Sequence, residues 1–130
     1  VGEVAKRFVR GDIGERLSKA RKNVLSPEVR QALKEAGVSY TPSPVRSDVE
    51  GVKLRLDEQA EYQAAVNRYT EEGFQRQFRN PNWARLEPSD REAVAQEVAQ
   101  VARERAGVEV LRKIGSAEIR RRQGETAGVR

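Results

Sequence analysis

The sequence contains no cysteine, no histidine and no methionine, and each absence removes a class of chemistry. Without cysteine there is no disulfide, no thiolate nucleophile and no cysteine-ligated metal. Without histidine there is no imidazole to serve as a general base or as a metal ligand. Because methionine is missing even at position 1, where Val1 stands, we expect the chain to be a piece of a longer protein.

Large apolar residues are scarce as well. Val, Ile, Leu and Phe make up about 22% of the chain, close to the roughly 20% level below which charged chains tend towards disorder. Charged residues account for 35%, so we expect a modest core between helices that gains part of its stability from a partner. No apolar run approaches the roughly 18 residues that a membrane span requires, and we expect no such span.

The net charge of +5 is distributed unevenly. Residues 1–37 and 103–130 are basic, whereas residues 38–102 carry more acidic than basic groups. Such basic ends are compatible with an acidic partner such as DNA but do not demand one.

Helix and turn signals predict an all-α fold in five segments. These are a basic helical segment (1–24), a short helix (25–37), an extended proline-containing connector (38–56), a helical hairpin (57–114) and a basic flexible tail (115–130). The two helices of the hairpin are expected at about 57–79 and 89–114.

Local signals set the ends of these helices. In the short helix, Ser26 is the expected cap, and Gly37 can end the helix in a left-handed conformation. Asp57 is the expected cap of the first hairpin helix, which should end by Arg79 because Pro81 disfavours helical geometry in the residue before it. Residues 89 and 92, a serine and a glutamate, have the spacing of a capping box for the second helix.

The connector ends in a stretch, residues 51–56, that alternates apolar and basic residues with the period of a short strand. One strand needs a partner, and the neighbouring sequence offers no good one. The stretch therefore either pairs with another chain or lays Val52, Leu54 and Leu56 along the hairpin.

Apolar residues recur at helical spacing in both hairpin helices and either hold the hairpin together or face a partner. They are Tyr62, Val66, Tyr69, Phe74, Phe78, Trp83, Leu86, Val94, Val98 and Val101, with Ala102 and Ala106 beside the valines. Trp83, the only tryptophan, either forms an exposed contact or fills the corner against Phe78 and Leu86, and the second interpretation is favoured. An aromatic stripe at helical spacing likewise favours core over groove. The candidates for a partner interface are Trp83, Leu86, Tyr62, Tyr69, Phe74 and Phe78.

Basic residues near the C-terminus are the candidates for phosphate contacts, namely Lys113, Arg120, Arg121 and Arg122. The competing interpretation is a solvated tail, because no interleaved aromatic residue or recognised nucleic-acid motif accompanies them.

Nothing in the sequence predicts catalysis. Carboxylate pairs such as Glu71/Glu72 and Asp90/Glu92 have charged neighbours, whereas a raised pKa requires burial or a trapped like charge. The acids are not clustered as a carboxylate metal site requires, and glycine-rich phosphate loops are missing. We expect no enzyme activity and no cofactor or metal.

Six features of the sequence, taken in their order along the chain, resemble a known class of proteins. The features are Leu25-Ser26-Pro27-Glu28 with Leu33 and Gly37, the proline connector, Gly51-Val52-Lys53-Leu54, the helix through Tyr62 and Tyr69, Asn80-Pro81-Asn82-Trp83-Ala84-Arg85-Leu86, and Asp90-Arg91-Glu92 leading into Val101-Ala102-Arg103. In this order they resemble the C-terminal region of very large tailed-bacteriophage proteins: internal virion (ejection) proteins, tape-measure-like proteins and large polyvalent proteins. The likeness covers roughly residues 25 to 106, although Leu56-Asp57-Glu58 lacks the usual Thr or Pro at a helix start.

The resemblance implies a non-enzymatic structural segment that is produced in the bacterial cytoplasm and assembled into the virion, inside the particle or in its tail. Implied partners are other copies of the chain and portal, tail or core proteins, met by helix packing that supports genome delivery. The residues leave open an alternative, a helical nucleic-acid-binding module that uses the basic terminal segments. A third possibility is a segment that accompanies an enzyme elsewhere in the parent protein.

Overall fold

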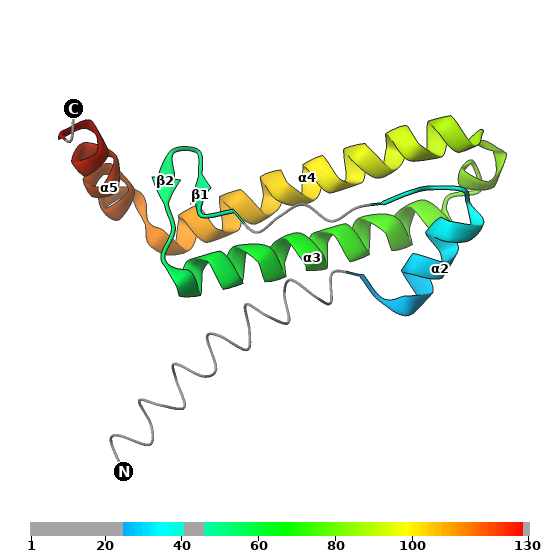
Figure 1. Cartoon of the computed structure of the whole chain (residues 1–130), viewed down its shortest axis with the longest axis horizontal. Helices are drawn as coiled ribbons and strands as arrows, with labels where there is room; N and C mark the ends of the chain where they lie inside the picture. Colours follow the sequence, from blue (N-terminus) through cyan, green and yellow to red (C-terminus); the bar gives the residue numbers. More distant parts are fainter. Residues whose placement is uncertain (1–24, 41–45, 129–130) are drawn as a thin grey trace, which may run out of the picture.

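The computed structural model describes residues 25–40 and 46–128, with side chains described as far as residue 124. Two long helices, α3 (Leu56–Arg79) and α4 (Pro88–Ile114), lie side by side and run in opposite directions (Figure 1). The short 3-10 helix η1 (Trp83–Arg85) joins them. The predicted all-α fold built on a helical hairpin is therefore confirmed. The predicted basic helical segment 1–24 lies outside the described residues.

Helix α2 (Pro27–Glu35) lies at the corner end of the hairpin. The Ser26 hydroxyl accepts a hydrogen bond from the Val29 amide at 3.3 Å, and Gly37 has a φ of +76° just beyond the helix. Both predicted signals are confirmed. Ser26 also joins α2 to α3, because its amide and hydroxyl donate to the Glu71 carboxylate at 2.8 and 2.7 Å.

The connector contains a β-hairpin that the sequence analysis missed. Strand β1 (Asp48–Val49) pairs antiparallel with β2 (Val52–Lys53) through the two-residue turn Glu50-Gly51. Both turn residues have positive φ, +50° and +79°, as a type I′ turn requires. The expectation that no good partner strand lies nearby is wrong, because the partner lies immediately upstream.

Residues 51–56, the stretch with strand periodicity, lie along the long helices only in part. Val52 and Leu54 are buried, with 1% and 4% of their surface exposed. Leu56, expected to follow them, begins α3 with 62% of its surface exposed. The change of period from strand to helix at this point turns its side chain outward.

Helix α3 ends at Arg79 as predicted but does not begin with the predicted cap. Arg55 is the capping residue, and its amide donates to the Glu58 carboxylate at 2.8 Å. Asp57 instead lies in the first turn, where its charge complements the helix dipole.

Helix α4 begins at Pro88, one residue before the predicted capping serine. Proline suits the first helical position because its missing amide hydrogen would have no partner there. Ser89 is thereby already helical, so the predicted capping box with Glu92 does not form.

Most of the buried hydrophobic residues form two clusters, one at each end of the hairpin. The cluster at the α2 end contains Leu25, Val29, Leu33, Ala36, Val38, Phe74 and Ala95. The cluster at the β-hairpin end contains Val49, Leu54, Tyr62, Ala65, Val66, Ala106 and Val110. Helices α3 and α4 contribute to both clusters and thereby connect them.

Alanines form most of the buried face of α4, with Gly107 and Val110 near its end. Ala95, Ala99, Ala102 and Ala106 are buried, whereas Val101 is 44% exposed. Of the two predicted roles of the valines, Val98 packs against the core, whereas Val101 is left at the surface. Small side chains let the neighbouring elements approach α4 closely, and this moves the valines to the edge of the contact.

The predicted flexible tail contains a helix, α5 (Ser116–Gly128), which a single residue, Gly115, separates from α4. The Arg122 guanidinium donates to Glu58 at 2.8 and 3.1 Å and to the Lys53 carbonyl at 2.9 Å. It also donates to Glu118 at 3.0 Å. These bonds join α5 to β2 and to the start of α3. Within the described segments, no helix is long and apolar enough to cross a membrane.

Candidate interaction surface

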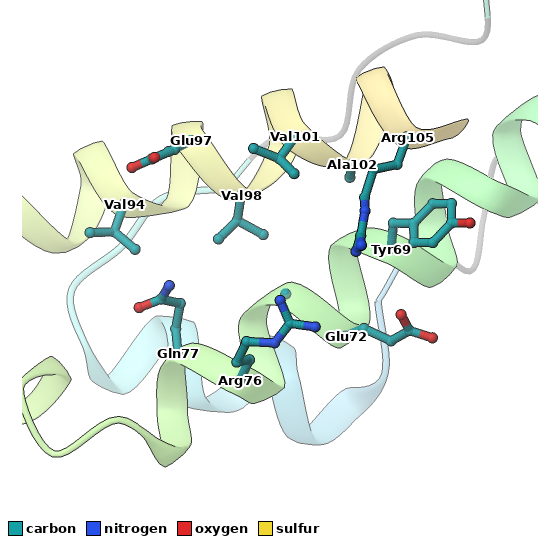
Figure 2. A pocket seen from close by; sticks show the side chains of 11 residues that line it. Tyr69, Glu72, Arg76, Gln77, Val94, Glu97, Val98, Val101, Ala102 and Arg105 are labelled. Atoms are coloured by element: carbon teal, nitrogen blue, oxygen red, sulfur yellow. The ribbon is translucent and has the colours of Figure 1, made fainter. Parts of the chain in front are cut away.

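A groove of about 190 Å³ runs between α3 and α4, and all of its lining residues come from these two helices (Figure 2). Helix α4 supplies Val94, Val98 and Val101, whose side chains point towards the gap. Helix α3 supplies Tyr69 and Gly73, which faces Val98. The groove therefore has an apolar floor that neither α2 nor the β-hairpin covers.

Gly73 sets the depth of the groove. A Cβ atom at this position would lie 2.7 Å from Cγ1 of Val98, which is closer than real contacts allow. Glycine at position 73 thus lets Val98 sink between the helices, where it packs against the cluster at the α2 end.

A second hollow of about 560 Å³ continues the groove towards the end of α4. The two hollows share Tyr69 and Arg105, and the second one adds Val108, which is 50% exposed. We call the two hollows together the α3–α4 groove. Along it, Val94, Val98, Val101 and Val108 lie on one face of α4, and we call them the valine stripe.

Charged and polar side chains border the stripe. Glu72, Arg76 and Gln77 line the α3 side, and Glu97 and Arg105 line the α4 side. Both signs are present, so the rim favours neither a purely cationic nor a purely anionic partner.

Tyr69 is held rigidly at the junction of the two hollows. Its hydroxyl donates to Glu109 at 3.0 Å, and Arg68 donates to both oxygens of the same carboxylate at 2.8 and 3.0 Å. The guanidinium carbons of Arg68 and Arg105 lie 4.9 and 5.4 Å from the centre of the Tyr69 ring. The Tyr69 hydroxyl, followed by the Arg68 guanidinium, lowers the pKa of Glu109 below its ordinary value. Fixing this side chain reduces the entropy lost when a partner covers the groove.

Trp83 packs at the corner of the hairpin against Phe78, and this part of the favoured interpretation is confirmed. The Trp83 ring lies 5.4 Å from the Phe78 ring, centre to centre. Arg91 then ties the corner to α2, because its guanidinium donates to the carbonyl oxygens of Trp83, Ala84 and Ala36 at 3.1, 2.9 and 3.2 Å.

The structure separates the six predicted interface residues. Tyr62 and Phe74 are buried in the two clusters, with 4% and 0% of their surface exposed, and are not available to a partner. Phe78, Trp83 and Leu86 are half-buried at or near the corner. Only Tyr69 lies in the α3–α4 groove.

Two residues of the groove, Arg105 and Val108, were missed by the sequence analysis. The signal that could have found them is the spacing that continues Val94, Val98 and Val101 by four and three residues to positions 105 and 108. An arginine at position 105 interrupts the apolar pattern and hides it.

The predicted phosphate contacts are mostly engaged within the chain. Arg122 bonds to Glu58 and Glu118, and Arg121 donates to Glu118 at 2.9 Å. The Lys113 ammonium lies 3.7 Å from a Glu61 carboxylate oxygen. Arg120 is exposed.

In the part of the chain that the structure describes, no group of three or more acidic side chains is arranged to hold a metal ion. Comparison of the chain with protein-family models, with curated proteins and with solved structures found no match.

Proposed function

We propose that this chain is a non-enzymatic interaction module that packs through the α3–α4 groove against a helix in a multi-subunit assembly. The observation that carries the proposal is the valine stripe, in which Val101 and Val108 are 44% and 50% exposed. Aligned exposed apolar residues bordered by polar ones are typical of interaction sites. A groove between two helices accepts the apolar face of a third.

We further propose that the assembly is the virion of a tailed phage, where the module contacts other copies or portal, tail or core proteins and supports genome delivery. The support is the resemblance in the order of segments over residues 25–106, together with the helical hairpin and the modest core. A chain with few large apolar residues gains stability when a partner covers its exposed valines.

The nucleic-acid alternative receives less support from the contacts. Three of its four candidate cations, Lys113, Arg121 and Arg122, already face carboxylates of the same chain. Phosphate binding would compete with these pairs. The competition is strongest at Arg122, whose side chain is 10% exposed, and weak at the exposed pairs of Lys113 and Arg121.

Mass spectrometry of purified phage particles tests the proposal, with particles measured before and after genome release and peptide amounts normalised to the major shell protein. We expect peptides of this chain in full particles. Their loss on genome release would identify an ejected internal protein, and their retention would identify a fixed portal or tail component. Peptides missing from both samples would refute the virion proposal.

A salt series separates the two binding modes. Association of the purified chain with a partner helix through the valine stripe should persist or strengthen between about 50 and 500 mM salt, because apolar contacts are not screened. Binding to DNA through several phosphates would instead fall steeply over this range.

A further inference from the structure

We infer that the occupant of the α3–α4 groove is helix α4 of a second copy of this chain, running antiparallel, with a two-fold axis passing beside Val101. This inference rests on the proposed function, because it names the partner of the same groove. It predicts a self-complementary dimer in which the two hairpins face each other through their valine stripes.

The spacing of the stripe favours an antiparallel, two-fold arrangement. Val94 lies seven residues before Val101 and Val108 lies seven residues after it. When two antiparallel copies of α4 cross at Val101, each Val94 therefore lies opposite Val108 of the second copy. The two exposed valines are then covered by apolar surface rather than by water, which is favourable in proportion to the area buried.

The charges of α4 favour the same orientation. Its first half, residues 88–100, carries three acidic groups and one basic group. Its second half, residues 102–114, carries four basic groups and two acidic groups. Antiparallel pairing places the acidic half of each copy beside the basic half of the other, whereas parallel pairing would place like charges together.

One pair on the groove rim follows from this register. Glu97 lies four residues before Val101 and Arg105 lies four residues after it, and both are exposed. Each Glu97 therefore faces Arg105 of the second copy, and the two-fold axis produces this pair twice. These rim pairs set the orientation, while the valines supply the contact area.

Sedimentation equilibrium of the whole chain, over protein concentrations from about 1 to 200 µM, is the first test. We expect twice the monomer mass of 14.6 kDa at the upper end. Val101→Glu should weaken association at least tenfold, because it places two charges at the centre of the interface. Gln96→Glu is the matched control, since it adds the same charge at an exposed position outside both hollows. Circular dichroism checks that both variants keep the helical content of the natural chain.

Disulfide cross-linking tests the orientation, and the natural chain has no cysteine to interfere. Val94→Cys mixed with Val108→Cys should give cross-linked heterodimers under oxidising conditions. Val94→Cys alone should not cross-link, because antiparallel pairing separates the two copies of position 94 by about 21 Å at 1.5 Å per residue, well beyond the reach of a disulfide. Efficient cross-linking of Val94→Cys with itself would mean parallel pairing and would overturn the inference.

The outcomes distinguish this inference from the proposal on which it rests. A chain that stays monomeric at all concentrations, yet is found in phage particles, overturns self-pairing and leaves the virion role to another partner helix. A chain that dimerises with the expected cross-links, yet is missing from particles, refutes the virion role and leaves self-pairing in place.

Discussion

At the scale of single residues, Gly73 lies where α3 and α4 pack tightly, against Val98. Replacing it by alanine would place a methyl group 2.7 Å from Cγ1 of Val98, so the helices must separate or Val98 must move. Alanine gains up to about 1 kcal/mol in a helix over glycine, but overpacking a well-fitted contact costs about 1–3 kcal/mol. We expect Gly73→Ala to lower the free energy of unfolding measured by urea denaturation. Val98→Ala in the same chain should relieve the clash, so that the two substitutions together cost less than their sum.

A second glycine serves as the control for Gly73→Ala. Gly124 lies in α5 with nothing within 4 Å of its would-be Cβ, so Gly124→Ala should be neutral or slightly stabilising. If Gly73→Ala were as harmless as Gly124→Ala, the close contact with Val98 would not limit the packing of α3 on α4.

Single-residue signals were read correctly where the chemistry is local. Ser26 and Gly37 act as predicted because a cap depends only on a few neighbouring backbone groups. Asp57 and Ser89 were read wrongly because each competes with a neighbour. Arg55 takes the capping position with the help of Glu58, and a proline precedes the serine at the first helical position.

At the scale of elements, α5 is attached mainly by charged groups. Arg121 and then Arg122 lower the pKa of Glu118 from its ordinary value of 4.5 to about 2, and Arg122 also lowers the pKa of Glu58. Carboxylates with lowered pKa values in the folded state stabilise it above their ordinary pKa and lose that contribution as the pH falls towards the folded value. Glu118 pairs within α5, whereas Glu58 binds α5 to the start of α3, so we expect α5 to detach as the pH falls below the ordinary Glu58 pKa of 4.5, before α3 and α4 separate. Hydrogen exchange of residues 116–124 against pH, compared with exchange in α3, measures this order.

The Arg122 contacts can also be removed at neutral pH. Arg122→Gln should raise the exchange rate of α5 to the level of the acid-treated natural chain and should abolish most of its pH dependence. Arg120→Gln is the matched control, because it makes the same change at an exposed position of the same helix. Equal protection of α5 in both variants would mean that these ion pairs do not hold the helix in place.

Two features at this scale were predicted less well, for different reasons. The β-hairpin was missed because Glu50, a residue that seldom adopts positive φ, occupies the first turn position, so the usual turn signal is weak. The sequence left open whether the valines of α4 face the core or a partner, because hydrophobicity favours valine in the core, whereas close approach of neighbouring elements selects alanine. Only the tertiary structure decides between these two criteria. The α3–α4 groove follows from the same choice, because the valines left outside the core are the ones that form it.

At the scale of the whole molecule, the two buried clusters are connected through α3 and α4 and should unfold together. Phe74→Leu changes the cluster at the α2 end, and Val110→Ala changes the cluster at the β-hairpin end. Each should lower the free energy of unfolding by about 1–2 kcal/mol, a large share of the roughly 5–15 kcal/mol typical of a folded domain.

Native-state hydrogen exchange tests this coupling. Because both helices run through both clusters, the slowest amides at both ends of α3 should lose protection by the same factor in each variant, about tenfold for 1.4 kcal/mol. Val101→Ala is the control, since that side chain is 44% exposed and lies outside both clusters. Loss of protection confined to the end of α3 nearest each substitution would show two separately stable halves. The hairpin would then not transmit the effect of partner binding at the groove from one end to the other.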